Sequence, residues 1–174
     1  MLEKIASGGQ TGVDRAALDV ACVLGLDVGG WCPWGRRAED GMIPDRYPLT
    51  ETPEPDYETR SRRNVEDADG TLILNLGRLE GGTALTADHA RQVGKPCLVV
   101  ALEEGIDWAA FRVWLEEHRI AVLNVAGPRE SQRPGVYEAA YCCLEALLRA
   151  GFPRECPRSL ADPTGHWRRA PPHD

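Results

Sequence analysis

The sequence of 174 residues lacks the features that mark membrane, secreted or zinc-binding proteins. No apolar run approaches the roughly 20 residues of a membrane-spanning helix, so we expect no membrane partner. Met1 to Lys4 lead directly into a predicted strand and leave no room for a signal peptide, which favours a cytoplasmic protein. The six cysteines form no C-x-x-C pair and no zinc-type spacing, which indicates reduced thiols and no metal site.

An excess of positive charge is also absent, because the net charge is −7, and we therefore expect no nucleic-acid partner. Neither a G-x-G-x-x-G motif nor a P-loop is present. The four histidines are scattered, and no serine elbow or Cys–His signature appears. No catalytic residue is therefore assigned; whether the chain is an enzyme stays open, and a binding protein is favoured.

The most informative stretch is a short apolar run that ends in a glycine-rich turn and continues as a helix. The turn reads Ser7-Gly8-Gly9-Gln10-Thr11-Gly12-Val13-Asp14-Arg15. Glycines expose backbone N–H groups, and a helix N-terminus adds the positive end of its dipole, which together favour an anion such as phosphate. We expect residues 7–14 to form the floor of an anion site. Thr11 and Asp14 are also expected to cap the helix, which would leave the amides of residues 7–10 free.

The same order of strand, glycine turn and helix recurs twice. One turn, 77–83, lies between a predicted strand over 70–76 and a helix over 84–93; another, 127–131, follows a strand over 120–125. The remaining predicted segments are strands over 2–7, 28–32 and 97–102, helices over 13–24, 57–67 and 107–118, a final helix that stops near 151, and a structureless loop over 33–56.

Alternating strands and helices predict an α/β fold with a parallel sheet in three layers, with helices on both faces. We expect one ligand-binding domain over 1–151 and a Pro/Arg-rich C-terminal tail over 152–174. Ligands of such sheets bind beyond the carboxyl ends of the strands. The three glycine turns, together with the loop over 31–41, should therefore converge on one edge.

The expected ligand is a planar, polar, phosphorylated small molecule. Backbone amides and threonine hydroxyls would bind the phosphate, arginines would neutralise it, and a tryptophan would stack on a ring. Each polar candidate also has a structural reading as a cap, an ion-pair partner or a turn, and Trp31 and Trp34 could instead form a small core under the loop. The candidates are Ser7, Gly8, Gly9, Gln10, Thr11, Gly12, Asp14, Arg15, Trp31, Arg36, Arg37, Glu39, Asp40, Asn75, Gly81, Gly82, Thr83, Thr86, Gly127, Arg129, Glu130 and Ser131.

Four motifs together resemble the molybdenum cofactor carrier proteins, in order over residues 3–148. They are the first glycine turn, Gly30-Trp31-Cys32-Pro33-x-Gly35-Arg36-Arg37-Ala38-Glu39-Asp40-Gly41, Gly81-Gly82-Thr83, and Asn124-Val125-Ala126-Gly127-Pro128-Arg129-Glu130-Ser131. The resemblance implies a Rossmann-like fold of the LOG-like, or lysine-decarboxylase-like, nucleotide-binding group. It also implies a homo-oligomer (dimer or tetramer) and the binding of molybdenum cofactor (molybdopterin), a phosphorylated pterin.

Two alternatives remain: a LOG-like nucleoside monophosphate phosphoribohydrolase, and a sensor of a nucleotide derivative. The hydrolases resemble Pro-Gly-Gly-x-Gly-Thr-x-x-Glu at the second turn. This chain has Gly81-Gly82-Thr83-Ala84-Leu85-Thr86 there, without the further glycine or the glutamate, and Asp88 is the nearest acid.

Overall fold

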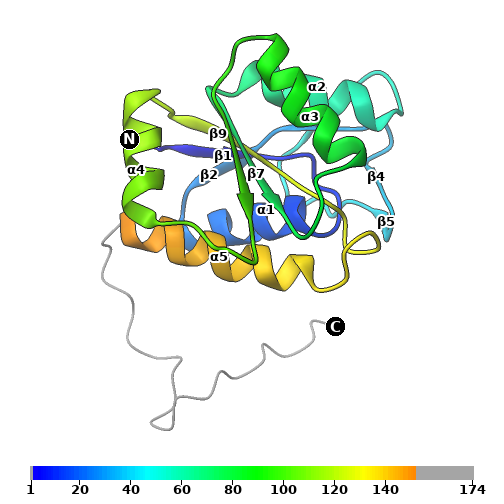
Figure 1. Cartoon of the computed structure of the whole chain (residues 1–174). Helices are drawn as coiled ribbons and strands as arrows, with labels where there is room; N and C mark the ends of the chain where they lie inside the picture. Colours follow the sequence, from blue (N-terminus) through cyan, green and yellow to red (C-terminus); the bar gives the residue numbers. More distant parts are fainter. Residues whose placement is uncertain (1, 152–174) are drawn as a thin grey trace, which may run out of the picture.

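A computed structural model describes residues 2–151, so the predicted tail over 152–174 lies outside the described residues. A parallel sheet of five strands in the order β2-β1-β9-β7-β8 forms its centre (Figure 1). Its strands are β1 (Lys4–Ala6), β2 (Asp27–Gly29), β7 (Gly70–Asn75), β8 (Cys97–Ala101) and β9 (Val122–Ala126). All five strands point the same way, so their carboxyl ends meet at one edge.

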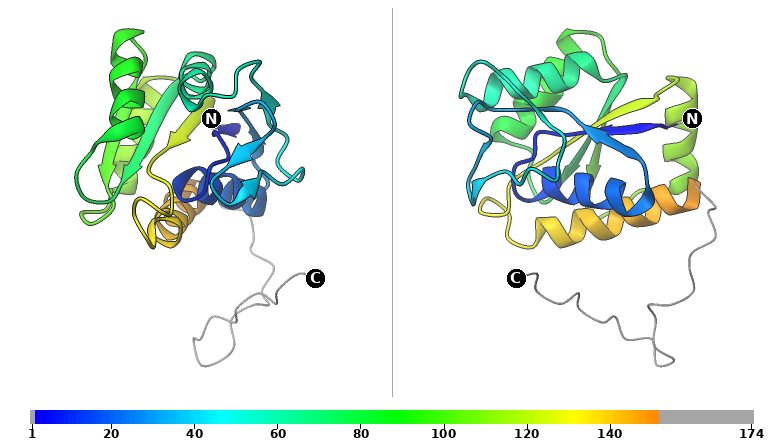
Figure 2. Two further views of the ribbon diagram at one scale, coloured as in Figure 1. Left: turned by 90° about the vertical axis from the view of Figure 1, so that its right-hand side faces the viewer. Right: turned by 180° about the vertical axis from the view of Figure 1, so that it is seen from behind.

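Helices cover both faces of this sheet, as predicted for a three-layer α/β fold. Figures 1 and 2 show α2 and α3 on one face, α1 and α5 on the other, and α4 at one side of the sheet next to the end of α5. The helices are α1 (Val13–Leu24), α2 (Tyr57–Asp67), α3 (Gly81–Gln92), α4 (Trp108–Glu117) and α5 (Val136–Gly151). Within residues 2–151, none of the helices is long and apolar enough to cross a membrane.

The main apolar core lies between the sheet and the layer of α1 and α5. Ile5, Leu72 and Leu123 from three adjacent strands are fully buried there against Val20 and Leu144. Six consecutive residues of β7 are buried, which matches its prediction as a central strand covered on both faces. This core holds the carboxyl ends of β1, β7 and β9 side by side.

The loop over 33–56 was predicted to be structureless, and this prediction was wrong. It contains an antiparallel pair, β4 (Arg37–Ala38) with β5 (Gly41–Met42). A parallel pair, β3 (Trp31–Cys32) with β6 (Thr50–Glu51), fastens the end of the loop. Dipeptide strands carry no detectable periodicity, so only their pairing defines them.

A second, small core does lie under the loop, but neither tryptophan belongs to it. It consists of Leu18, Cys32, Ile43, Tyr47 and Leu49. Trp34 is 60% exposed. Cys32 is fully buried in this small core.

Several predicted boundaries also need correction. The predicted strand over 28–32 breaks at Gly30, where a Cβ would lie 2.4 Å from the Ser7 carbonyl oxygen. Helix α3 begins at Gly81 rather than at 84, so the second glycine turn supplies its first turn. The predicted bounds of α1 and α2 are confirmed, and Asp107 caps α4 by accepting a hydrogen bond from the Ala109 N–H at 3.0 Å.

Candidate functional site

A cavity of about 350 Å³ opens at the carboxyl edge of the sheet, between α2, α3 and the loop after β9. All three glycine turns contribute to its wall, so their predicted convergence is observed. The predicted site residues that line it are Gln10, Asp14, Gly82, Thr83, Thr86, Gly127 and Arg129. This volume lies at the lower end of the range of small-molecule sites.

The turn between β1 and α1 is filled by the protein's own backbone. A Cβ on Gly12 would lie 2.4 Å from the Pro128 carbonyl oxygen, and a Cβ on Gly127 would lie 2.3 Å from the Leu74 carbonyl oxygen. The Val13 N–H donates to the Pro128 carbonyl at 3.3 Å. The N-terminus of α1 is therefore closed by the loop after β9 and does not face an open anion site.

The predicted cap at this turn was also wrong. Gly12 is the N-cap of α1, and no side chain caps it. Two of the amides expected to be free are used, because the Ser7 N–H donates to the Gly29 carbonyl at 3.0 Å and the Gln10 N–H donates to Asp14 Oδ2 at 3.3 Å. Asp14 therefore bonds the residue two positions before the N-cap and does not cap the helix.

The turn before α3 is open by contrast. A Cβ on Gly81 or Gly82 would meet nothing within 4 Å. No side chain caps α3, and no acceptor within the described chain bonds the N–H groups of Gly81, Gly82 and Thr83. Unbonded N–H groups at the start of a 12-residue helix attract anions.

Arg129 also lines the cavity, and its charge helps to lower the pKa of Glu39. Its guanidinium carbon is 4.9 Å from the centroid of the Tyr57 ring. Across residues 2–151, no carbonyl or carboxylate accepts a hydrogen bond from this guanidinium. Its N–H donors are therefore available to a ligand in the cavity that it shares with Gly82 and Thr83.

A buried ion pair forms another part of the cavity wall. Arg60 Nη1 donates to Asp14 Oδ2 at 2.9 Å, and the Asp14 side chain is only 3% exposed. Burial raises the pKa of Asp14, and the opposing effects of Arg60 and the Gln10 N–H do not cancel this rise. Two buried donors, Arg60 Nε and Gln10 Nε2, have no partner in the described part of the protein.

Trp31 and Arg36 do not line the cavity. The Trp31 indole donates to Asp67 at 2.6 Å, and its ring lies under the Arg63 guanidinium at 4.8 Å, so it packs on α2. Arg36 donates to four backbone carbonyls of its own loop, including those of Ile43 and Tyr47. The exposed Arg37 does not line the cavity either.

Glu39 joins the loop to the two other turns outside the cavity. Its carboxylate accepts from the Ser131 N–H at 3.1 Å and from the hydroxyls of Ser131 and Thr11. Burial opposes its ionisation, but these hydrogen bonds prevail and hold the pKa of Glu39 below its usual range. The same loop also forms an ion pair, between Asp40 Oδ1 and Arg15 Nη2 at 3.3 Å.

The other candidates have structural contacts. Glu130 accepts from the N–H groups of Gly135 and Tyr137 at the start of α5, and Asn75 Nδ2 donates to the Gly77 carbonyl at 2.7 Å. Ser7 Oγ donates to the Val125 carbonyl at 2.7 Å. Four candidate glycines also lie outside the cavity wall: Gly8, Gly9, Gly12 and Gly81.

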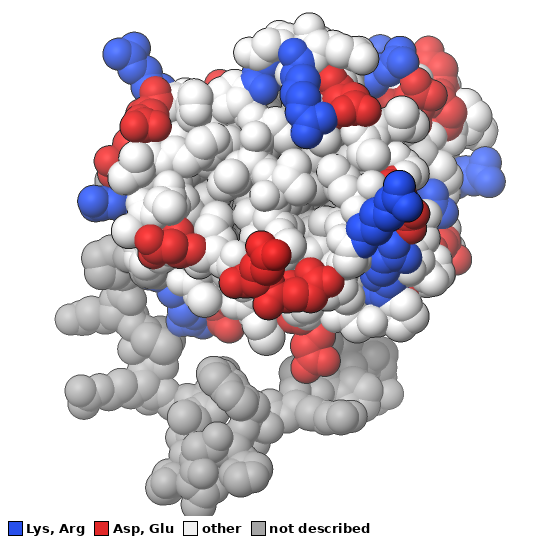
Figure 3. Space-filling model, in the orientation of Figure 1, with Lys and Arg blue, Asp and Glu red and all other residues white. Residues whose placement is uncertain are grey.

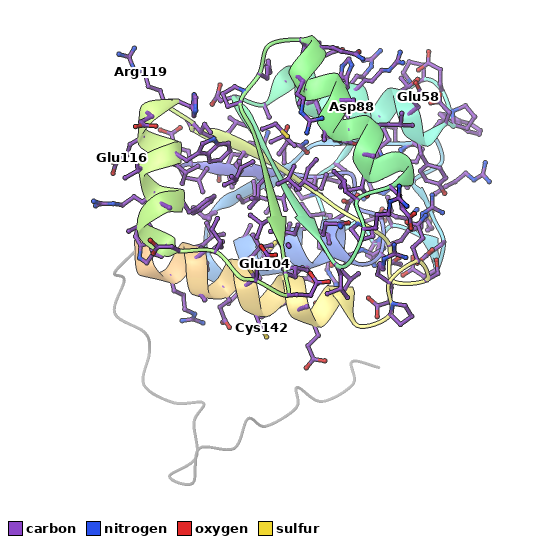
Figure 4. The ribbon with its side chains drawn as sticks, in the orientation of Figure 1. Glu58, Asp88, Glu104, Glu116, Arg119 and Cys142 are labelled. Atoms are coloured by element: carbon purple, nitrogen blue, oxygen red, sulfur yellow. The ribbon has the colours of Figure 1, made fainter. Side chains whose placement is uncertain are left out.

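Sequence reasoning missed the contributions of α2 and of the outer part of α3. The lining residues that were not among the candidates are Tyr57, Glu58, Arg60, Ser61, Arg62, Leu85, Asp88, His89, Gln92, Ala126 and Gln132. Figure 4 shows Glu58 on α2 and Asp88 on α3, on the side of the molecule that these two helices form. The spacing 82, 85, 86, 89 follows one face of α3 and could have indicated this wall.

Charged side chains form small local groups rather than one extended charged surface. On the face seen in Figure 3, small groups of Lys and Arg and of Asp and Glu surround a largely uncharged centre. Arg62 pairs with Glu58 at 2.6 Å, and Asp88 pairs with Arg91 at 2.6 Å. In the described range 2–151, no three His, Cys, Asp or Glu side chains gather as a metal site.

Comparison with known proteins gives a family and a solved relative. The model of the circularly permutated YpsA SLOG family matches residues 5–148. The chain is 48% identical to a crystal structure of a "Putative molybdenum carrier protein" from Syntrophus aciditrophicus SB, with a TM-score of 0.80 over 84% of this chain and 95% of that one. No curated protein matches the sequence.

Proposed function

Since the chain belongs to the circularly permutated YpsA SLOG family, we propose that it binds a small phosphorylated ligand, with molybdenum cofactor as the leading candidate cargo. The resemblance of its motifs and the name of the relative both suggest a carrier. A nucleotide-like anion is the alternative ligand. We assign the role of binding, without turnover, to the cavity at the carboxyl edge of the sheet.

One observation carries this proposal: a guanidinium without a hydrogen-bond acceptor and an uncapped helix N-terminus both line the same cavity. Arg129 has donors without acceptors, and Gly82 and Thr83 offer N–H groups at the start of α3. A guanidinium binds phosphate through two parallel hydrogen bonds, and the helix dipole adds to the attraction. This end would hold the phosphate.

The rest of the cavity suits a flat, polar ring. Tyr57 and Leu85 provide apolar surface, while Asp14, Ser61 and Gln92 provide hydrogen-bonding groups. A phosphorylated pterin would be held by its phosphate and ring, and its dithiolene would carry the molybdenum. The cargo would therefore need no protein ligand on the metal.

The hydrolase alternative has less support from the geometry. Asp88, the acid nearest to the second turn, lines the cavity but is paired with Arg91 and 57% exposed. Glu39 is engaged with Ser131 and Thr11 outside the cavity. If the chain were a hydrolase, it would release free base from AMP, and Asp88→Asn would slow that release.

The carrier proposal is tested with molybdopterin released from a molybdoenzyme. We expect the purified protein to retain it through gel filtration and to lengthen its half-life toward air oxidation. Arg129→Gln should weaken retention by about 10- to 100-fold, the value of a charge-assisted hydrogen bond.

Arg112→Gln is the matched control, because Arg112 also lies over an aromatic ring, that of Trp108 at 5.6 Å, but on α4 and away from the cavity. Retention by this variant should equal that of the wild type. Equal oxidation rates with and without the wild-type protein would refute the carrier role.

A further inference from the structure

Asp14 and Arg60 bring a free hydrogen-bond acceptor and free donors to the cavity wall. Asp14 Oδ2 is occupied by Arg60 and the Gln10 N–H, and nothing in the described chain donates to its other oxygen, Oδ1. Asp14 lines the cavity and is otherwise buried, so Oδ1 is the oxygen left for a ligand.

The donors beside this oxygen also lack partners. Gln10 is 4% exposed and lines the cavity, and its Nε2 has no acceptor in the structure from 2 to 151. Its Oε1 already accepts from the N–H groups of Thr11 and Glu39, which fixes which end of the amide is free. Arg60 Nε is likewise buried without a partner there, and its Nη2 has no bonded acceptor.

Arg60 Nε and Gln10 Nε2 are themselves fully buried, so the polar atoms that a ligand can reach without a side-chain movement are Asp14 Oδ1 and Arg60 Nη2. The acceptor on Asp14 requires an N–H on the ligand, and the Nη2 donor on Arg60 requires a carbonyl oxygen next to it. A lactam edge has this arrangement. It occurs in the 4-oxo ring of pterins and in guanine, hypoxanthine and uracil; adenine carries the reverse, with a ring acceptor beside an amino donor.

We infer that Asp14 and Arg60 select phosphorylated heterocycles that carry a lactam N–H and C=O edge, and that they reject 6-amino purines. This inference rests on the proposed function, because the phosphate held at Arg129 anchors the ligand and keeps the ring from turning over. With adenine, the ring nitrogen lone pair would face the Asp14 carboxylate, and the amino group would face the donors of Arg60.

IMP and AMP form the matched pair of probes, because they share ribose and phosphate and differ only at the 6-oxo or 6-amino group. Titration calorimetry on the wild-type protein should give at least tenfold tighter binding of IMP than of AMP, since one charge-assisted hydrogen bond is lost and a repulsion replaces it. GMP should resemble IMP.

Asp14→Asn should bring the IMP-to-AMP ratio close to one, because an amide offers both a donor and an acceptor. Asp27→Asn, the same change on the exposed residue of β2, should keep the wild-type ratio. Far-UV circular dichroism establishes that each variant is folded, and the wild-type ratio decides the question even if Asp14→Asn does not fold.

Equal binding of IMP and AMP, or no binding of either, would overturn the lactam inference. The carrier proposal fails separately, when molybdopterin is neither retained nor protected. Binding of both nucleotides with equal affinity that is lost in Arg129→Gln would leave the phosphate site in place and remove only the selectivity.

Discussion

The turn after β1 and the turn after β7 have the same order of strand, glycines and helix, yet one is closed and the other open. In the first, Gly12 lies against the Pro128 carbonyl and the helix N-terminus is covered by protein. In the second, nothing lies within 4 Å of a Cβ placed on Gly82, and the first N–H groups of α3 are unbonded.

The difference shows that glycine in such a turn has two distinct uses. It allows two backbone segments to approach each other, as at Gly12, or it leaves a helix N-terminus open to a ligand, as proposed at Gly82. Local sequence does not separate the two, because the distinction depends on whether a third segment covers the turn. The loop after β9 covers the first turn. At the second turn its Arg133 binds the Leu76 carbonyl and the Glu80 carboxylate, but Gly81 and Gly82 stay clear.

The largest effect is expected from breaking the buried ion pair between Arg60 and Asp14, next to the closed turn. Arg60→Met should lower the free energy of unfolding by about 3–5 kcal/mol at pH 8, because Asp14 would remain buried without a counter-charge. Burial already raises the pKa of Asp14, and loss of Arg60 would raise it further. A raised pKa means that the folded state keeps the proton at pH values where the unfolded state has lost it, so stability declines as pH rises from the usual value of 3.8 through the raised pKa. We therefore expect this variant to be less stable at pH 8 than at pH 5.

Urea denaturation at both pH values measures this loss. Arg62→Met is the control on the same helix, because Arg62 forms an exposed i,i+4 pair with Glu58. Its cost should stay within about 0.5 kcal/mol. A pH-independent cost for Arg60→Met would show that Asp14 does not titrate in that variant.

A paired glycine substitution compares the two turns directly. Gly12→Ala should lower the free energy of unfolding by about 2–5 kcal/mol, because φ is +76° and the new Cβ would meet the Pro128 carbonyl. Gly82→Ala should leave stability equal or raise it by about 0.5–1 kcal/mol, since alanine favours a helix.

The same Gly82→Ala variant should bind phosphorylated ligands more weakly, because its methyl group would occupy the open helix end. Denaturant melts and IMP titrations on both variants measure these two effects. A stability loss at Gly82 equal to that at Gly12 would contradict the contrast between the turns.

The smallest effect concerns Glu39, which joins the loop to the first and third turns. Glu39→Gln should lower the free energy of unfolding by at most about 1 kcal/mol at pH 7, because this carboxylate is exposed. Hydrogen bonds from Ser131 and Thr11 lower its pKa, so its contribution exists above the usual value of 4.5 and is lost as pH falls through the lowered pKa.

Unfolding monitored from pH 7 to pH 3 should therefore show the difference between wild type and Glu39→Gln shrinking in acid. Glu117→Gln, on the exposed face of α4, serves as the control and should show no such change. A difference that persists unchanged at pH 3 would exclude the carboxylate as its source.

The sequence by itself determined the α/β class, the bounds of α1 and α2, and the edge on which the three turns meet. Those features follow from local rules: the periods of helices and strands, glycine and cap positions, and the common direction of parallel strands. Gln10, Asp14, Gly82 and Arg129 were therefore found as cavity residues from the sequence alone.

Only the tertiary structure decided which turn is closed and what completes the cavity. Arg60 lies 46 residues from Asp14, on helix α2, and Trp31 packs on α2 instead of facing the cavity. Such pairings arise when distant elements dock, because burial and partner identity depend on contacts that no local pattern contains.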